Sequence, residues 1–212
     1  MRVVFADRAD AGRQLAARLT YLRPSDPVVV GLPRGGVPVA YEVARALHAP
    51  LDVIVVRKLG LPVDSEVAMG AIGEGGKRVL NDDIVRHVGV SAGELRTVED
   101  RERALLEARE TLFRGGRPRC ELYGRVVIIV DDGIATGATA RVACEVARQL
   151  GALRVVVAVP VAPAGADLRL GADEIVSVVQ PAEFWAVGAH YRDFRATTDA
   201  EVVALLAAET VS

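Results

Sequence analysis

The chain has 212 residues, enough for one domain that buries a sizeable core. Hydrophobic residues make up 51% of the sequence but aromatic residues only 4%, so we expect a core of Val, Leu and Ala rather than rings. The net charge of −2 gives no electrostatic reason for a nucleic acid to be the main partner.

Two further features indicate a cytoplasmic protein. No apolar run approaches the length of a membrane span, and the apolar start of the chain is too short for a signal peptide. Cys120 and Cys144 lie far apart and outside any metal-ligand spacing, so we expect free thiols in a reducing compartment. We therefore predict a cytoplasmic location and no membrane partner.

The first part of the chain predicts a helix, a strand and a second helix. Apolar spacing indicates a helix over 8–19, with Asp7 as its N-cap. A short buried strand follows over 28–32, and a helix over 37–47 comes after a turn.

That turn, Pro33-Arg34-Gly35-Gly36, is suited to an anion. The amides of Gly35 and Gly36 can form an anion nest, and Arg34 places a fixed positive charge beside it. By itself, however, such a sequence is more often an ordinary tight turn.

The next strand is predicted over 51–56 and ends at Arg57 and Lys58. Ligands of α/β proteins bind at the carboxyl ends of the strands, so both charges suit an anionic ligand there. The alternative is a solvated strand end. Residues 59–66 have the composition of a loop.

Residues 67–80 predict two short strands around a glycine turn at 73–76. Glu74 lies in this turn, and a solvated turn acid is a simpler interpretation than a functional one.

A helical insertion is predicted over about 82–115. Ser91 and Glu94 form a capping box that starts a long charged helix, which runs to about Phe113. Its Arg/Glu alternation indicates a solvent-facing surface with i,i+4 ion pairs, or part of a dimer contact.

The most informative stretch is 126–139. Five β-branched residues predict a central strand buried on both faces, and Asp131 and Asp132 follow at its carboxyl end. A Gly/Ala/Thr turn then leads into a helix over 140–150, and its amides can wrap a phosphate. The two carboxylates suit sugar hydroxyls, or a Mg²⁺ held partly by its substrate. The alternative is an ordinary strand, acidic turn and helix.

The remaining pattern predicts a strand over 153–159, a short helix over 163–170 and a strand over 174–179. The alternation predicts an α/β fold, a doubly wound and mainly parallel sheet with helices on both faces. We expect one domain over 1–212, with a core over about 25–180 and a C-terminal tail over 181–212.

The acidic stretch and the Arg-Gly-Gly turn together resemble the type I phosphoribosyltransferase family. The resemblance is specific over 28–58 and 126–159. It implies that the diphosphate of phosphoribosyl diphosphate is bound by Arg34, Gly35, Gly36, Arg57 and Lys58. It implies that the ribose hydroxyls are held by Asp131 and Asp132. The substrate loop would consist of Gly133, Ile134, Ala135, Thr136, Gly137, Ala138 and Thr139, of which the last four fix the 5′-phosphate.

The resemblance also implies an enzymatic reaction of nucleotide metabolism. A phosphoribosyltransferase, which is a kind of glycosyltransferase, moves the phosphoribosyl group to a ring nitrogen of a small acceptor and releases diphosphate with Mg²⁺. The catalytic residues would be Arg34, Lys58, Asp131 and Asp132. The two acids would contact the metal only through substrate or water. The protein is also expected to form a homodimer.

Two positions depart from the family's pattern. Gly133 stands where the family usually has a branched apolar residue. Ala135 stands where relatives that use 6-oxopurines commonly have an acid, which argues against hypoxanthine or guanine as the acceptor.

The tail holds most of the aromatic residues, and in the family a small hood of terminal segments covers the base. We expect Phe184 or Trp185 to stack on a planar acceptor. The alternative is a satellite core that pins a C-terminal helix beginning at Asp199. His190 is the only histidine near the expected site.

A second class of function stays open. A non-catalytic regulator could use the same fold to sense phosphoribosyl diphosphate or a nucleotide. The intact acidic and diphosphate loops favour the enzyme.

Overall fold

The computed structural model describes residues 4–65, 67–165 and 170–209. Its centre is a sheet of five parallel strands in the order β2-β1-β6-β7-β8. These strands are β1 (Val28–Gly31), β2 (Leu51–Val53), β6 (Val126–Val130), β7 (Arg154–Val161) and β8 (Glu174–Val179). A separate antiparallel sheet contains β3 (Val56–Gly60), β4 (Ala68–Gly73) and β5 (Lys77–Leu80).

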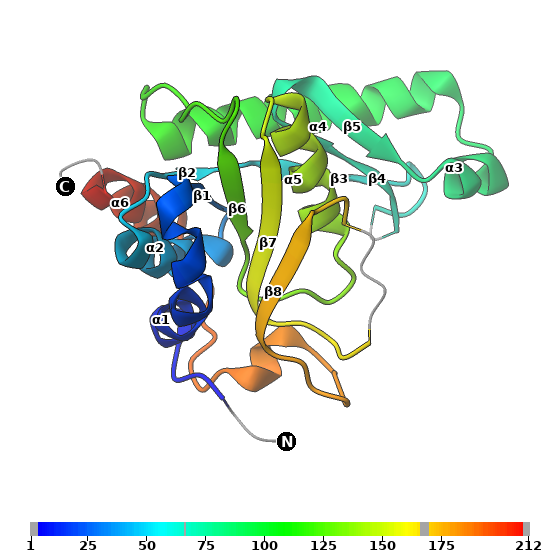
Figure 1. The fold of residues 1–212 in the computed structure, drawn as a ribbon. Coiled ribbons are helices and arrows are strands. Elements are labelled where there is room, and N and C mark those ends of the chain that lie inside the picture. Colours follow the sequence, from blue (N-terminus) through cyan, green and yellow to red (C-terminus); the bar gives the residue numbers. More distant parts are fainter. Residues whose placement is uncertain (1–3, 66, 166–169, 210–212) are drawn as a thin grey trace.

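Helices cover both faces of the main sheet, as predicted (Figure 1). The helices that the structure describes are α1 (Arg8–Leu19), α2 (Gly36–Leu47), α3 (Asp82–Val88), α4 (Ala92–Arg114), α5 (Ala138–Gln149) and α6 (Asp199–Glu209). Short 3₁₀ turns occur at η1 (Thr20–Ser25), η2 (Glu74–Gly76) and η3 (Val187–His190). None of the helices that the structure describes is long and apolar enough to span a bilayer.

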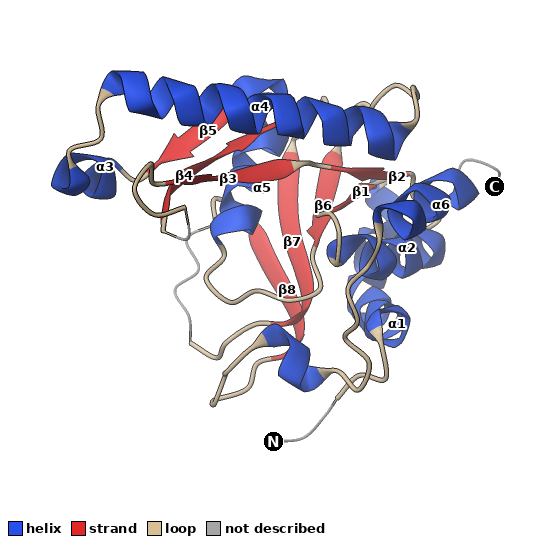
Figure 2. Ribbon diagram, turned by 180° about the vertical axis from the view of Figure 1, so that it is seen from behind, coloured by secondary structure: helices blue, strands red, loops and turns tan. Residues whose placement is uncertain are grey.

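The central strand β6 shows how the two faces are built. All five of its residues are buried. Because side chains alternate along a strand, Ile128 packs in the core that includes α1 and α2, whereas Ile129 packs in the core under α5. Helix α5 also contacts the small sheet on its far side, and α4 lies along the other face of that sheet (Figure 2).

Several local signals gave the right boundaries. The side chain of Asp7 accepts a hydrogen bond from the amide of Asp10, so it is the N-cap of α1 as predicted. Ser91 and Glu94 make the predicted capping box at the start of α4. Cys144 is a buried free thiol and Cys120 a partly buried one.

The predicted strand over 51–56 is wrong as a single element. β2 ends at Val53, and after two residues the chain enters β3 in the small sheet. The amide of Val55 donates to the Glu74 carboxylate at 2.9 Å instead of continuing the main ladder. Arg57 and Lys58 therefore lie within a strand of the antiparallel sheet.

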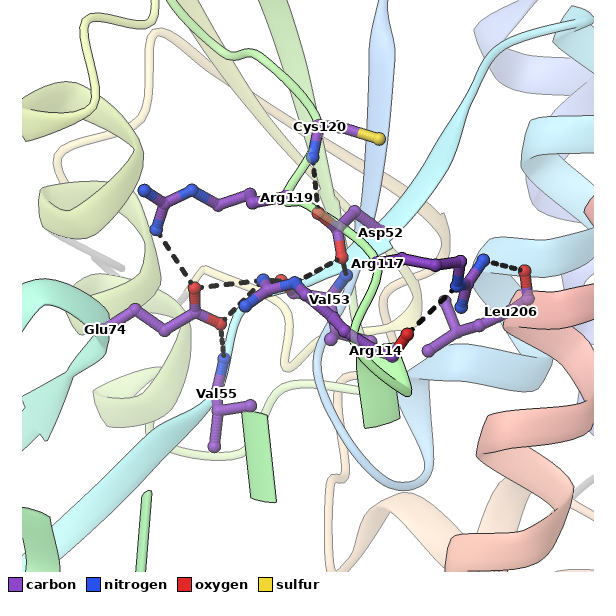
Figure 3. Close-up of polar contacts among 9 residues, drawn as sticks. All are labelled: Asp52, Val53, Val55, Glu74, Arg114, Arg117, Arg119, Cys120 and Leu206. Carbon is purple, nitrogen blue, oxygen red and sulfur yellow. Dashed lines mark hydrogen bonds and ion pairs between the residues drawn. The ribbon is translucent and has the colours of Figure 1, made fainter. Parts of the chain in front are cut away.

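Glu74 is not a solvated turn acid, because it is only 1% exposed. Arg114 donates to both of its carboxylate oxygens at 3.0 Å, and Arg119 donates to one of them at 3.2 Å (Figure 3). Arg114 also donates to Asp52 at 3.0 Å. This ionic cluster joins the end of α4 to β2 and to the turn of the small sheet.

The acids of α4 are likewise not confined to a solvated surface. Glu99 and Glu102 are 7% and 6% exposed. They pair with Arg78 of β5 and Arg57 of β3. The helix thus uses its charges to hold the small sheet.

The helix predicted over 163–170 lies mostly outside the described residues. Pro163 to Gly165 are described, and they are not helical. β8 and α6 follow where the sequence predicted them, with α6 beginning at Asp199.

Candidate active site

The two glycine-containing loops leave neighbouring strands at the same edge of the sheet. β1 pairs with β6 in parallel, with Gly31 opposite Val130. The amide of Leu32 continues this pairing by donating to Val130 O at 2.8 Å. From β1 the chain goes to β2 on one side, while β6 to β8 lie on the other, so this is the switch point where ligands of doubly wound sheets bind.

The Arg34-Gly35-Gly36 turn packs directly against the acidic pair. The peptide bond between Pro33 and Arg34 is cis. A β-carbon on Gly36 would lie 2.6 Å from Val130 O, and one on Gly35 would lie 2.1 Å from Asp132 Oδ2. Glycine fits at both positions because Gly36 packs against the backbone of Val130 and Gly35 packs against the side chain of Asp132, which leaves no room for a β-carbon.

The loop after Asp132 surrounds a hollow of about 180 Å³, lined by residues between Asp131 and Ala140 and by Val187. Gly137 is the N-cap of α5 and has a φ of 77°, which suits glycine. No backbone amide from Ala135 to Thr139 has a hydrogen-bond acceptor among the described residues. These amides and the start of α5 are therefore available to a phosphate.

The two acids differ in their contacts. The Asp131 carboxylate accepts a hydrogen bond from the Asp132 amide at 2.9 Å. Burial raises the pKa of Asp131 well above its ordinary value, and the neighbouring Asp132 carboxylate adds to that rise. Burial also raises the pKa of Asp132, while Arg8 acts in the opposite direction. Such a pair suits hydroxyl donors rather than another anion.

Arg8 is a site residue that the sequence did not reveal. Its Nε and Nη2 donate to Asp132 Oδ2 at 2.9 and 2.7 Å. One signal existed. A cation in the first turn of a helix faces the positive end of the helix dipole, which is unfavourable unless an anion compensates it. The partner, 124 residues away, could not be read from the sequence.

The C-terminal tail also reaches the acidic loop. The Tyr191 hydroxyl donates to Asp132 O at 2.6 Å, and Tyr191 pairs with Phe5 of the N-terminal segment. The orange tail lies beside that segment at the base of Figure 1. Val187 explains Gly133, since a β-carbon on Gly133 would lie 2.5 Å from Val187 Cγ1 and 2.9 Å from Val161 Cγ1.

The three cations expected at the diphosphate lie in different surroundings. Arg34 precedes Gly35 in the turn after β1, but its Nη1 lies 3.8 Å from Asp199 Oδ1. Arg57 points toward α4 and pairs with Glu102 at 2.7 Å. Lys58 is the next residue of the strand, so it faces the opposite side, where α5 packs, and it is exposed.

The aromatic residues of the tail were expected either to stack on an acceptor or to form a satellite core, and they differ in their surroundings. Phe184 is partly buried and stacks on His190 with ring centroids 5.9 Å apart. Trp185 is 80% exposed. His190 is buried, burial lowers its pKa, and its Nε2 has no partner among the described residues. Phe5 and Tyr191 form a satellite core that supports the tail beside the acidic loop.

The donor set fits an indirect role in metal binding. The described residues contain no group of three or more His, Cys, Asp or Glu side chains placed to share a metal ion. Asp131 and Asp132 alone cannot enclose Mg²⁺, but they could contact an ion whose other ligands are phosphate oxygens and water.

Comparison with known proteins connects this site to one family. A family model described as "Phosphoribosyl transferase domain" matches residues 7–193. Two curated Mycobacterium tuberculosis proteins, "Putative phosphoribosyl transferase" MT0597 (strain CDC 1551) and Rv0571c (strain H37Rv), are each 57% identical over 205 residues. The matches cover 96% of this chain and 46% of each relative, so the chain spans about half the length of these curated relatives.

Solved structures agree on the fold. The crystal structure of TT1426 from Thermus thermophilus is 48% identical, with a TM-score of 0.82 over 96% of this chain and 97% of that one. A hypothetical protein from Neisseria gonorrhoeae, solved with bound ppGpp, is 16% identical with a TM-score of 0.52 over 97% and 96% of the two chains. The second likeness concerns the fold alone.

Proposed function

This chain belongs to the phosphoribosyl transferase family, and we propose from that premise that it transfers the 5-phosphoribosyl group of phosphoribosyl diphosphate to a ring nitrogen of a small acceptor. The observation that carries the proposal is the contact between Gly35 and Asp132. It puts a loop suited to a diphosphate, an acidic pair suited to a ribose and a loop suited to a 5′-phosphate at one edge of the sheet.

The proposed reaction is a displacement at the anomeric carbon. The C1–O bond breaks and its electron pair leaves with the diphosphate, while the lone pair of the acceptor nitrogen forms the new C–N bond and that nitrogen releases its proton to water. Bond breaking runs ahead of attack, so the sugar gains oxocarbenium character, as in glycoside transfer. Asp131 and Asp132 would hold the ribose hydroxyls and favour that positive charge.

The other residues would bind and neutralise the phosphates. Arg34 and Lys58, with the amides of Gly35 and Gly36, would stabilise the departing diphosphate. The amides from Thr136 to Thr139 would hold the 5′-phosphate. A Mg²⁺ bound with the diphosphate would offset further negative charge. For Arg34 this role requires its side chain to turn from Asp199 toward the ligand.

The acceptor is proposed to be a small nitrogen heterocycle other than a 6-oxopurine, since Ala135 replaces the acid expected for that group. Trp185 is exposed in the tail and is proposed to stack on this acceptor. The homodimer and the cytoplasmic location stay predictions.

One observation favours a second function, a sensor that binds phosphoribosyl diphosphate without turning it over. Arg57 is engaged by Glu102, and Arg34 faces Asp199. Two of the cations expected at the diphosphate thus have other partners. A sensor needs the binding loops but not the full set of leaving-group contacts.

The test is a screen of bases and small nitrogen heterocycles with phosphoribosyl diphosphate and Mg²⁺, in which diphosphate release is measured. The proposal predicts release that depends on one acceptor class. Tight binding of phosphoribosyl diphosphate by calorimetry, with no release for any acceptor, would favour the sensor. Absence of both binding and release would contradict both functions.

A further inference from the structure

Arg8 makes three hydrogen bonds and one ring contact beside the acidic pair. Its Nε and Nη2 both donate to the same oxygen, Asp132 Oδ2. The side chains of Arg8 and Asp132 are 11% and 15% exposed. An ion pair with so little solvent contact is maintained only when its geometry is good, and here two N–H groups of one guanidinium donate to the same carboxylate oxygen.

The tail holds Arg8 from the other side. Its Nη1 donates to Arg195 O at 2.7 Å, and its guanidinium carbon lies 4.0 Å from the centre of the Phe194 ring. Three of the arginine's nitrogens are therefore engaged and one face is covered. This leaves the guanidinium little freedom to rotate away from Asp132.

These contacts leave the other carboxylate oxygen available. Both arginine bonds end on Asp132 Oδ2, and no described residue donates to Oδ1. The main chain at this position is also fixed, since Tyr191 donates to Asp132 O. The carboxylate is thus held in one orientation with one oxygen committed and one oxygen open.

We propose that Arg8 is a positioning residue for phosphoribosyl transfer, which acts through Asp132. By holding Oδ2, it directs Oδ1 toward the place where a ribose hydroxyl binds, while Phe194 and Arg195 keep the arginine in place. This inference rests on the proposed function. It adds a requirement that the N-terminal helix and the C-terminal tail be assembled before the sugar site is competent.

Two other roles for Arg8 make different predictions. If the role of Arg8 were purely structural, its removal would lower the stability of the fold. It would not change how the binding of phosphoribosyl diphosphate depends on Asp132. If Arg8 instead competed with the sugar for Asp132, it would weaken the binding of phosphoribosyl diphosphate. Removal of Arg8 would then tighten that binding.

The experiment is a double-mutant cycle with Arg8→Gln, Asp132→Asn and the double variant. The dissociation constant for phosphoribosyl diphosphate with Mg²⁺ is measured by calorimetry, and KM and kcat are measured where diphosphate is released. We expect Arg8→Gln alone to weaken binding by about tenfold, the value of a hydrogen bond to a charged group. In the Asp132→Asn background, the same change is expected to have less than about a twofold effect, because its target is gone.

Two further variants complete the design. Arg8→Lys keeps the charge but lacks the planar guanidinium that donates two hydrogen bonds to Asp132 Oδ2, so it is expected to recover part of the loss and to supply a folded variant if Arg8→Gln unfolds. Arg13→Gln is the matched control on the same helix, since Arg13 is 59% exposed and has only distant ion-pair partners at 3.8 and 3.9 Å. It is expected to bind like the wild type.

Each outcome decides a specific question. If the losses of affinity in the two single variants multiply in the double variant, the inference is overturned and the proposed function is left intact. Tighter binding by Arg8→Gln would have the same meaning. A wild-type protein that neither binds phosphoribosyl diphosphate nor releases diphosphate would overturn the proposed function and the inference with it.

Discussion

Gly35 lies so close to Asp132 that a β-carbon on the glycine would be 2.1 Å from the carboxylate oxygen Oδ2. The two residues come from turns after different strands, so this contact fixes how the turns lie relative to each other. Any side chain at position 35 must displace the acid or the turn.

Gly35→Ala is therefore expected to lower kcat/KM by about a hundredfold, the effect of moving a catalytic group by about 1 Å. Gly93→Ala is the matched control. A β-carbon there meets no atom closer than 3.9 Å, and alanine favours the helix in which Gly93 lies. Steady-state kinetics and thermal unfolding of both variants check this. Normal activity of Gly35→Ala would show that the contact has no role in the reaction.

Asp132→Asn keeps the size of the side chain but removes its charge. We expect turnover to fall by about a hundredfold, because the sugar cation loses a partner in a site with little solvent. Diphosphate release by a preparation of wild-type purity is the measurement, and circular dichroism verifies the fold. Unchanged release would remove Asp132 from the proposed mechanism.

Gly133→Ala is expected to lower the free energy of unfolding by about 1–3 kcal/mol, since its new methyl group overlaps Val187 and Val161. Shortening the side chain of the tail residue with Val187→Ala should restore part of that loss. Denaturant unfolding of the two single variants and the double variant measures this coupling. Simple addition of the two effects would contradict the packing described for the tail.

Arg114→Ala leaves the carboxylates of Asp52 and Glu74 buried without their shared partner. A decrease of about 3–5 kcal/mol in the free energy of unfolding is expected. Arg86→Ala is the control, because Arg86 is 75% exposed in an exposed ion pair, and its removal should change stability by less than about 0.5 kcal/mol. Similar melting temperatures for the two variants would exclude a structural role for the cluster.

Glu110 gives a prediction about pH. Burial, and then the charge of Glu74, raise the pKa of Glu110 from 4.5 to about 7, although Arg114 and Arg119 oppose this. Between these pH values the folded protein keeps a proton that the unfolded chain has lost. The free energy of unfolding therefore falls as the pH rises through this window.

Glu110→Gln removes that dependence. The free energy of unfolding of the variant, minus that of the wild type, is expected to be about 1 kcal/mol larger at pH 8 than at pH 4. This value is reduced for the partial exposure of Glu110. Chemical unfolding of both proteins at the two pH values is the check. An equal difference at both would mean that the raised pKa does not affect folding.

The sequence was most informative where structure depends on near neighbours. The capping box of Ser91 and Glu94, the N-cap at Asp7 and the strand over 174–179 all depend on residues close in the chain, and all were confirmed.

The predictions were wrong or incomplete where the structure depends on residues that are far apart in the chain. The break after Val53 depends on Glu74, which competes for the Val55 amide, and on Arg114, which makes the burial of Glu74 possible. Arg8 and Tyr191 reach Asp132 across 124 and 59 residues. No periodicity or spacing within a short window carries such information.

The pairing of β1 with β6 has a consequence for folding. Residues that face each other across these strands are about a hundred positions apart in the chain, so closing this loop has a large entropic cost. Contacts of that range generally form late. We therefore expect the two halves of the ligand site to meet only after the intervening hairpin and helices have become compact, and neither half of a chain cut between Arg114 and Val126 would contain a complete site.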